Sequence, residues 1–354
     1  EKKNIVRMSE EETRKIQFTG KSTYIVSLPK KWVGDLGLKK GDQILVQRKG
    51  TSSLQIVPYN TRTKRESEIA TLEIDPKEQP SSVERKLIAL YFLHFKTISI
   101  KPIKGRITPS QRTGIRNAVK KILMGSEITA ESSDGITIQI LINLVELSVV
   151  GALKRMLLLA KSMQNDALLA IKEGNTELAN EVINSDDDVD RFSFYITRQL
   201  AIAIENEHLL KEMGFSNARD CLGYRLIIKN IERMGDHAVR ISKDVLDYKK
   251  PISGKVFDAI RDMSDFAISV IDDASDALFQ GDIDRAEQAV TDAQNITKKE
   301  KRIMDYLKLN IDEEEKYRIR RIVENTRRIA EYASDVGEIV LNMNIEKIIK
   351  KPKM

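Results

Sequence analysis

The chain has 354 residues, of which 41% are hydrophobic, 5% aromatic and 32% charged, with a net charge of +6. A chain of this length and composition buries a sizeable core and is expected to divide into two or three domains. Its most apolar window, residues 136–160, contains Glu146, Lys154 and Arg155 and follows no short charged leader, which argues against a membrane-spanning helix and a signal peptide. We therefore expect a cytoplasmic protein that is not embedded in a membrane.

The positive charge is concentrated at the N-terminus. Residues 1–64 contain 14 Lys and Arg against 6 Asp and Glu, a net charge of +8, so the other 290 residues together carry −2. This asymmetry favours an acidic partner for the N-terminal segment, DNA above all. The alternative is a lysine-rich surface that is simply solvated.

The N-terminal segment, residues 1–60, is predicted to form four short strands and one short helix. The strands are expected at 14–20, 22–29, 42–50 and 52–59, and the helix at 29–37. About fifty residues make a thin core, so this two-hairpin unit is expected to bury its apolar face against a second copy.

An ordered pattern of residues runs through this segment. It consists of an apolar residue with Pro, a short basic helix, Leu-Gly-Leu, a charged pair and Gly-Asp. The matching residues are Leu28, Pro29, Lys30, Leu36, Gly37, Leu38, Gly41 and Asp42. The pattern resembles the AbrB/MazE-like (SpoVT-AbrB) swapped-hairpin fold of transcription factors and antitoxins.

That resemblance implies an intertwined homodimer that binds DNA through basic residues of the first strand and the adjoining loop. In this chain those residues are Arg14, Lys15, Lys21, Lys30 and Lys31. The stretch from Gly20 to Pro29 is several residues longer than is usual in that family. The hairpin that presents the basic side chains is therefore expected to be remodelled.

Residues 65–145 alternate between strand and helix signals. The elements expected in order are a strand at 67–74, a helix at 81–95 with a serine cap, a strand at 96–102, a helix at 108–123 capped by Thr108, and a hairpin of 126–133 with 135–142. This βαβαββ order predicts a small α+β domain. Its sequence contains no phosphate loop, metal-ligand spacing or nucleophile–base pair, so a ligand-sensing role and a spacer role both stay open.

From residue 148 onward the sequence is helical and consists of two similar halves. The segment 167–184 aligns with 276–291, and the segment 232–238 aligns with 327–333. Three helices are expected in each half: 148–172, 176–207 and 216–247 in repeat 1 (148–249), and 256–279, 282–309 and 314–342 in repeat 2 (255–347).

Paired carboxylates stand out in the first repeat. Glu232 and Asp236 lie four residues apart on the third helix, beside its apolar seam, and Asp186 and Asp190 have the same spacing on the second helix. If the two helices are neighbours, four like charges converge and repel unless a cation is bound. All-oxygen ligands suit hard cations such as Mg²⁺, Mn²⁺ or iron. The alternative is a solvated acidic stretch, with Glu232 paired to a neighbouring arginine, Arg233 or Arg240.

These motifs carry a second resemblance. The run "ELANEVINSDDDVDRFSFYITRQL" followed by "IKNIERMGDHAVRISKDV" resembles the PhoU family of phosphate-uptake regulators, over residues 148–347. The resemblance implies two three-helix bundles that bind clusters of iron, zinc, magnesium or manganese. The metal-binding positions that it implies are Asp186, Asp190, Glu232 and Asp236.

The second repeat departs from this pattern. Ala293 and Thr297 stand where the first repeat has its two aspartates, and Arg327 with Glu331 stands where it has Glu232 and Asp236. We therefore expect one metal site rather than two, with Glu331 left as a salt-bridge partner of Arg327 or its neighbour Arg328.

The two resemblances together imply a multidomain α+β regulator. PhoU proteins report phosphate status by contacting the ATP-binding subunit of a phosphate transporter and a sensor kinase. We predict a metal-binding dimer that regulates transcription of phosphate-transport genes. One alternative is an adaptor that docks on the transporter ATPase and only dimerises through its N-terminal domain. A metal-dependent hydrolase is disfavoured, because only His237 accompanies the carboxylates and it points to another helix face.

Overall fold

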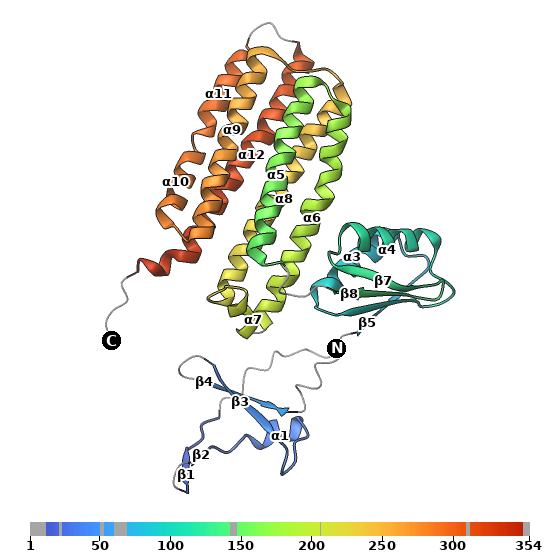
Figure 1. Ribbon diagram of the computed structural model, residues 1–354, viewed down its shortest axis with the longest axis vertical. Helices are drawn as coiled ribbons and strands as arrows, with labels where there is room; N and C mark the ends of the chain where they lie inside the picture. Colours follow the sequence, from blue (N-terminus) through green and yellow to red (C-terminus); the bar gives the residue numbers. More distant parts are fainter. Residues whose placement is uncertain are drawn as a thin grey trace, which may run out of the picture. The chain divides into compact units, whose positions relative to one another are not determined.

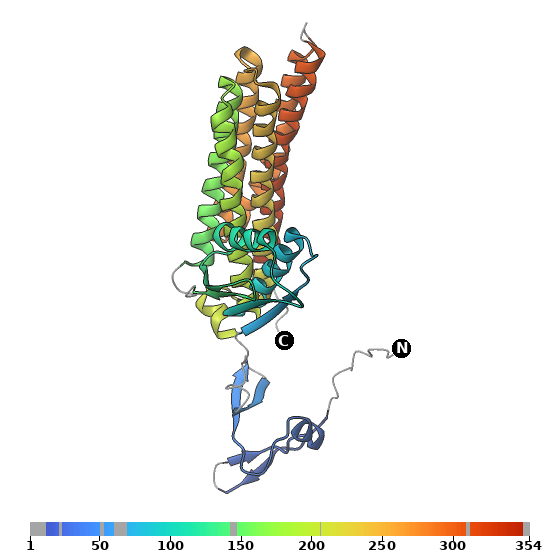
Figure 2. The same ribbon diagram turned by 90° about the vertical axis from the view of Figure 1, so that its right-hand side faces the viewer.

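A computed structural model describes residues 12–20, 23–49, 53–59, 69–141, 147–205, 207–308 and 312–349. The chain divides into two compact units, residues 1–67 and 68–354, each of which is described by itself. Figures 1 and 2 show both units in two perpendicular views.

The N-terminal unit contains two antiparallel hairpins and one helix. Its elements are β1 (Gln17–Thr19), β2 (Thr23–Ile25), α1 (Lys30–Asp35), β3 (Ile44–Lys49) and β4 (Ser53–Pro58). Strand β1 pairs with β2, and β3 pairs with β4. The predicted β-rich unit with one short helix is confirmed, although its strands are shorter than the sequence suggested.

A single copy of this unit has almost no core. Pro58 is the one buried residue among those described in the unit. Phe18, Tyr24 and Leu54 are 58%, 74% and 66% exposed. Their apolar surface is therefore left in contact with water in one copy, which is unfavourable by roughly 25 cal/mol for each Å².

The second unit begins with a two-layer α/β domain. Its elements are β5 (Ile69–Ile74), α3 (Pro80–Phe92), β6 (Thr97–Pro102), α4 (Pro109–Lys121), β7 (Ser126–Glu131) and β8 (Ile136–Ile140). The sheet order is β5-β6-β8-β7, with β5 and β6 parallel and the other pairs antiparallel. Both helices pack on one face of the sheet, where Ile98 and Ile138 meet Leu87, Tyr91 and Ile115 (Figure 1). The predicted βαβαββ order is confirmed.

The two helices of this domain begin in different ways. Thr108 caps α4 as predicted, since its hydroxyl accepts from the backbone N–H of Gln111 in a capping box. The serine cap predicted for α3 is wrong, because that helix begins at Pro80 after Gln79, without a side-chain cap. Proline has its φ already set for the first helical turn, which lets the helix start before the serines.

Long helices form the rest of the second unit. They are α5 (Val149–Glu173), α6 (Thr176–Glu205), α7 (Glu207–Glu212), α8 (Ala218–Tyr248), α9 (Gly254–Gln280), α10 (Ile283–Ala293), α11 (Ile296–Tyr306) and α12 (Glu313–Asn344), followed by the short 3₁₀ helix η1 (Ile345–Lys347). Helix α8 packs against α5, α6 and α12, while α12 packs against α9 and α10 (Figure 1). The two repeats thus meet along α8 and α12, and the predicted double three-helix arrangement is confirmed.

Two details of the bundle differ from the sequence prediction. The single helix predicted at 282–309 is two helices, α10 and α11, separated at Gln294 and Asn295 by a tight turn with i→i+3 hydrogen bonds. Asparagine favours such turns because its side chain competes for backbone hydrogen bonds. The short helix α7 lies between α6 and α8 and has no counterpart in the prediction.

Across the helices that the structure describes, none combines the length and the apolar character needed to cross a membrane.

Candidate metal centre

The structure brings the two predicted carboxylate pairs to one face of the α6–α8 pair. Asp186 and Asp190 lie one turn apart on α6, and Glu232 and Asp236 lie one turn apart on α8, which packs directly against α6. The helices approach closely at Gly235, where an added Cβ would lie 3.3 Å from the Asp186 Oδ1 atom. The four side chains are all partly buried.

Burial and mutual repulsion make this group of carboxylates unfavourable in its ionised form. Burial, with the charges of Glu232, Asp186 and Asp236, raises the pKa of Asp190 to about 7. Burial, with the charges of Asp236, Asp187 and Glu232, raises the pKa of Asp186 to about 6. Near neutral pH the group therefore favours either a proton or a bound cation.

Glu232 already has partners from the protein. Its Oε1 atom lies 2.5 Å from the Lys229 ammonium nitrogen, and its Oε2 atom accepts from the Ser193 hydroxyl at 3.4 Å. The alternative that paired Glu232 with Arg233 or Arg240 therefore chose the wrong cation. Arg233 lies over the Tyr332 ring instead. A metal ion that binds Glu232 has to compete with Lys229.

The donor set fits a hard cation, although the side chains do not form a finished ligand shell. Carboxylate oxygens are the ligands that Mg²⁺, Mn²⁺ and iron accept, and the raised pKa values of Asp186 and Asp190 reflect an uncompensated negative charge. In the part of the chain that the structure describes, no group of three or more His, Cys, Asp or Glu side chains is arranged to hold a metal ion. The carboxylates would therefore have to change rotamer to close around one.

The corresponding place in the second repeat carries its own cation. Arg327 forms an ion pair with Glu331 and lies 3.5 Å from the carboxylate of Glu300. Arg328 also pairs with Glu331, at 2.8 Å. The predicted salt bridges of Glu331 are confirmed. The guanidinium of Arg327 thus places a positive charge where the first repeat has the carboxylate of Glu232.

His237 does not take part in the carboxylate group. Its Nδ1 and Nε2 atoms lie 2.6 Å from the Asn325 Oδ1 atom and 3.0 Å from the Tyr332 hydroxyl. Burial lowers the pKa of His237. Both ring nitrogens thus contact side chains of α12. His237 therefore points away from the carboxylates, as predicted.

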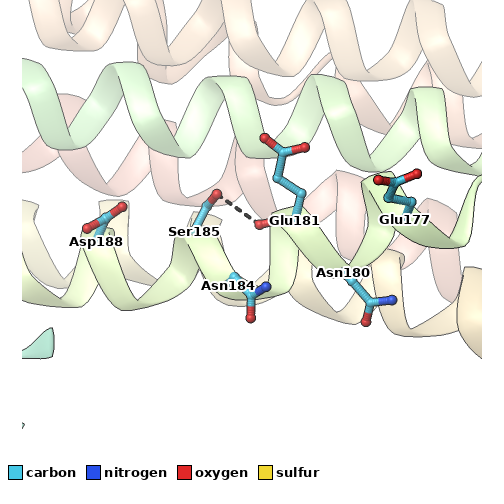
Figure 3. A pocket seen from close by; sticks show the side chains of 6 residues that line it. All are labelled: Glu177, Asn180, Glu181, Asn184, Ser185 and Asp188. Atoms are coloured by element: carbon cyan, nitrogen blue, oxygen red, sulfur yellow. Dashed lines mark hydrogen bonds between the residues drawn. The ribbon is translucent and has the colours of Figure 1, made fainter. Parts of the chain in front are cut away.

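A shallow polar groove lies along another part of α6. Figure 3 shows its lining and the hydrogen bond that the Ser185 hydroxyl donates to the Glu181 carbonyl at 2.9 Å. The lining residues are Glu177, Asn180, Glu181, Asn184, Ser185 and Asp188, and the cavity volume is about 420 Å³. None of the four predicted metal-binding residues lines this groove.

Sequence reasoning missed how α6 also holds the α/β domain. The buried Arg198 of α6 donates to the backbone carbonyls of Tyr91 and Phe95, at the C-terminal end of α3. Lys121, the last residue of α4, forms a 2.7 Å ion pair with Asp187 of α6. The helix that carries two of the carboxylates is thereby fixed to both helices of the α/β domain.

The residues predicted to contact DNA lie in the first unit. Arg14 forms an ion pair with Glu12, and Lys15 lies two residues before the start of β1. Lys30 and Lys31 are exposed in the first turn of α1. Lys21 lies outside the described residues.

Comparison with known proteins places both units. A family model described as "PhoU domain" matches residues 153–245 and 260–340, and one described as "Antidote-toxin recognition MazE, bacterial antitoxin" matches residues 17–64. The chain thus joins a β-rich unit that matches an antitoxin model to a helical unit that matches the PhoU domain. Its C-terminal part is a PhoU domain, and its N-terminal part is a MazE/AbrB-like domain.

Three similar proteins illustrate the match. Two curated relatives, both named "Phosphate-specific transport system accessory protein PhoU homolog", come from Borreliella burgdorferi and Clostridium acetobutylicum. The first is 28% identical over 197 residues, covering 52% of this chain and 86% of the relative. The second is 24% identical over 193 residues, covering 54% and 85%. The crystal structure of the phosphate transport system regulatory protein PhoU from Streptococcus pneumoniae has 19% identity and a TM-score of 0.48, covering 57% of this chain and 96% of that one.

Proposed function

We propose that this protein is an accessory regulator of phosphate transport that acts as a homodimer and regulates transcription of phosphate-transport genes. The observation that carries the proposal is the match of both helical repeats to the PhoU domain, over residues 153–245 and 260–340. The curated relatives of that part are named as accessory proteins of a phosphate-specific transport system.

We further propose that Asp186, Asp190, Glu232 and Asp236 hold one or more oxygen-ligated metal ions: Mg²⁺, Mn²⁺, iron or zinc. When bound, the metal supplies positive charge that neutralises the group. Asp186 and Asp190 would hold the metal as carboxylates, without the protons that their raised pKa values favour, and Glu232 would bind it in place of Lys229.

The metal content of the purified protein tests this proposal. After chelation and reloading with each metal in turn, elemental analysis compares the wild type with Glu232→Ala/Asp236→Ala. The matched control is Glu177→Ala/Glu181→Ala, which removes two carboxylates with the same spacing from the groove of Figure 3. We expect metal in the wild type and in the control but not in the first variant. Equal metal content in all three proteins contradicts the proposal.

The DNA-binding step is supported by three features of the first unit. Residues 1–64 carry a net charge of +8, residues 17–64 match the MazE antitoxin model, and exposed apolar side chains such as Phe18 and Tyr24 require cover that a second copy would give. A dimer doubles the number of basic residues presented to DNA, and with it the salt dependence of binding.

Retention of genomic DNA fragments by the intact protein tests this step. We expect selective retention of fragments upstream of phosphate-transport genes, falling steeply with salt, and a shallower salt dependence for Arg14→Ala/Lys15→Ala. Absence of retention, or binding that ignores sequence, leaves the adaptor alternative. The thin core of the first unit supports that alternative, because the unit needs a second copy to bury its apolar side chains whether or not it binds DNA. The adaptor alternative predicts that the protein captures the transporter ATPase.

Catalysis is not part of the proposal. A hydrolytic metal site needs a general acid or base beside the metal-bound water. His237, the histidine next to Asp236 in sequence, has both nitrogens engaged by Asn325 and Tyr332. Phosphatase turnover that disappears in Asp190→Ala would contradict this view.

A further inference from the structure

One end of the helical bundle exposes a group of aliphatic side chains. Leu222 and Leu226 near the start of α8 are 63% and 57% exposed, while Ile348 and Ile349 after η1 are 62% and 53% exposed. Ile345 in η1 is 39% exposed. The first turns of α8 and the end of α12 lie at the same end of the bundle in Figures 1 and 2. We refer to these five residues as the end patch.

Direct contacts join the two halves of the end patch. An added Cβ at Gly223 would overlap the side chain of Met343, so the backbone of α8 lies against the last turn of α12. One turn earlier, Arg219 forms a 2.7 Å ion pair with Glu346 of η1. Leu222 lies between these two contact points. The exposed leucines of α8 and the isoleucines at and after η1 therefore lie at one end of the bundle, on segments that contact each other.

Exposed cations lie beside the end patch. They are Arg219 and Arg225 of α8 and Lys347 of η1. Arg219 is paired with Glu346, and the Lys347 ammonium donates to the Gly281 carbonyl at 3.1 Å, so Arg225 is the one of these three without such a contact to the described residues. The first two turns of α8 carry Arg219 and Arg225 against Asp220.

We propose that this end of the bundle docks on the surface of an anionic lipid bilayer. Large aliphatic side chains on helix surfaces enter the boundary between headgroups and acyl chains, while neighbouring Lys and Arg are attracted to anionic headgroups. Protein-binding hot spots are instead enriched in Trp, Tyr and Arg, and the end patch has no aromatic member. Docking of this kind requires no spanning helix, in keeping with the described helices. The inference goes beyond the proposed function and does not depend on it.

Co-sedimentation of the intact protein with vesicles tests the proposal. Vesicles of phosphatidylcholine with about one third phosphatidylglycerol are compared with phosphatidylcholine alone, near physiological salt. We expect binding to the anionic vesicles, and at least tenfold weaker partitioning for both Leu222→Ser/Leu226→Ser and Ile348→Ser/Ile349→Ser. The control is Leu158→Ser/Leu169→Ser on α5, whose leucines are 61% and 40% exposed away from the end patch. It should bind within twofold of the wild type.

The basic first unit needs a separate control, because it too is attracted to anionic lipid. Arg14→Gln/Lys15→Gln should retain most of the vesicle binding. The proposal is overturned if this variant abolishes binding while the end-patch variants bind like the wild type. It is also overturned if the wild type does not bind anionic vesicles. If the end-patch variants then lose a protein partner that the wild type binds, the end patch is a protein interface. Metal content and DNA retention of the end-patch variants should equal those of the wild type, which separates this inference from the proposed function.

Discussion

Replacing Asp190 by asparagine should stabilise the metal-free protein at alkaline pH. The folded protein raises the pKa of Asp190 from 3.8 to about 7, so between these values the native state binds more protons than the unfolded chain. The stability contributed by this group is therefore lost as the pH rises through the window. Each pKa unit corresponds to about 1.4 kcal/mol, which sets an upper bound of about 4–5 kcal/mol. Partial exposure and coupling to Asp186 reduce our expected gain to about 2 kcal/mol at pH 8. The gain should be less than about 1 kcal/mol at pH 5, which lies only about one pKa unit above the unfolded value.

Urea unfolding at pH 5 and pH 8, with a chelator present throughout, measures this effect. Asp188→Asn is the control, since it makes the same chemical change at an exposed position of the same helix, and it should leave stability within about 0.5 kcal/mol. Saturating metal should stabilise the wild type more than Asp190→Asn, because binding to the native state adds stability. A variant no more stable than the wild type at pH 8 would show that the carboxylates do not repel one another as described.

Three further changes probe the packing of the second unit. Arg318→Ala should lower the free energy of unfolding by about 3–5 kcal/mol. Arg318 and Asp244 form an ion pair in which both side chains are 2% exposed, so the substitution leaves Asp244 as an unpaired buried charge. Urea unfolding measures the loss, and the double variant Asp244→Leu/Arg318→Met should recover the stability. Gly337→Ala should cost about 1–3 kcal/mol in thermal unfolding, because its Cβ would lie 2.8 Å from Val290 Cγ2, and an unchanged melting temperature would contradict the close approach of α10 and α12. Arg198→Gln should accelerate amide exchange at the C-terminal end of α3, where the guanidinium donates to backbone carbonyls; unaltered exchange there would rule out its anchoring role.

The sequence predicted most helix boundaries of the bundle to within one or two residues, because both repeats carry local signals. Gly174 and Gly281 end α5 and α9 in the left-handed conformation, with φ of 65° and 64°, and apolar spacing defined the helices between them. The i, i+4 spacing of the carboxylates also placed each pair on one helix face, since that relation is fixed by helix geometry alone.

Features that depend on contacts between elements escaped prediction. The anchoring of α3 by Arg198 joins residues more than one hundred positions apart, and nothing in the local sequence marks an arginine as the partner of a distant helix end. The choice of Lys229 over Arg233 as the partner of Glu232 was missed for a different reason. Lys229 and Arg233 are both close to Glu232 in sequence. Arg233 lies over the ring of Tyr332, a residue of α12, and Lys229 is left to pair with Glu232.

Comparing the repeats explains why only the first is a candidate for metal. In repeat 1, the Ser193 hydroxyl donates to Glu232. Asp186 and Asp190 add two further negative charges beside Glu232 and Asp236, and no buried cation compensates them among the described residues. In repeat 2, Glu300 contacts Arg327, and the guanidinium compensates the remaining carboxylates in fixed geometry. The helix break at Gln294 and Asn295 also falls where the aspartate motif lies in repeat 1. The second repeat is thus neutralised by the chain itself, whereas charge in the first changes with pH or with bound cations. A response to metal would therefore arise on the α6–α8 face, on the helix whose Asp187 pairs with Lys121 of the α/β domain.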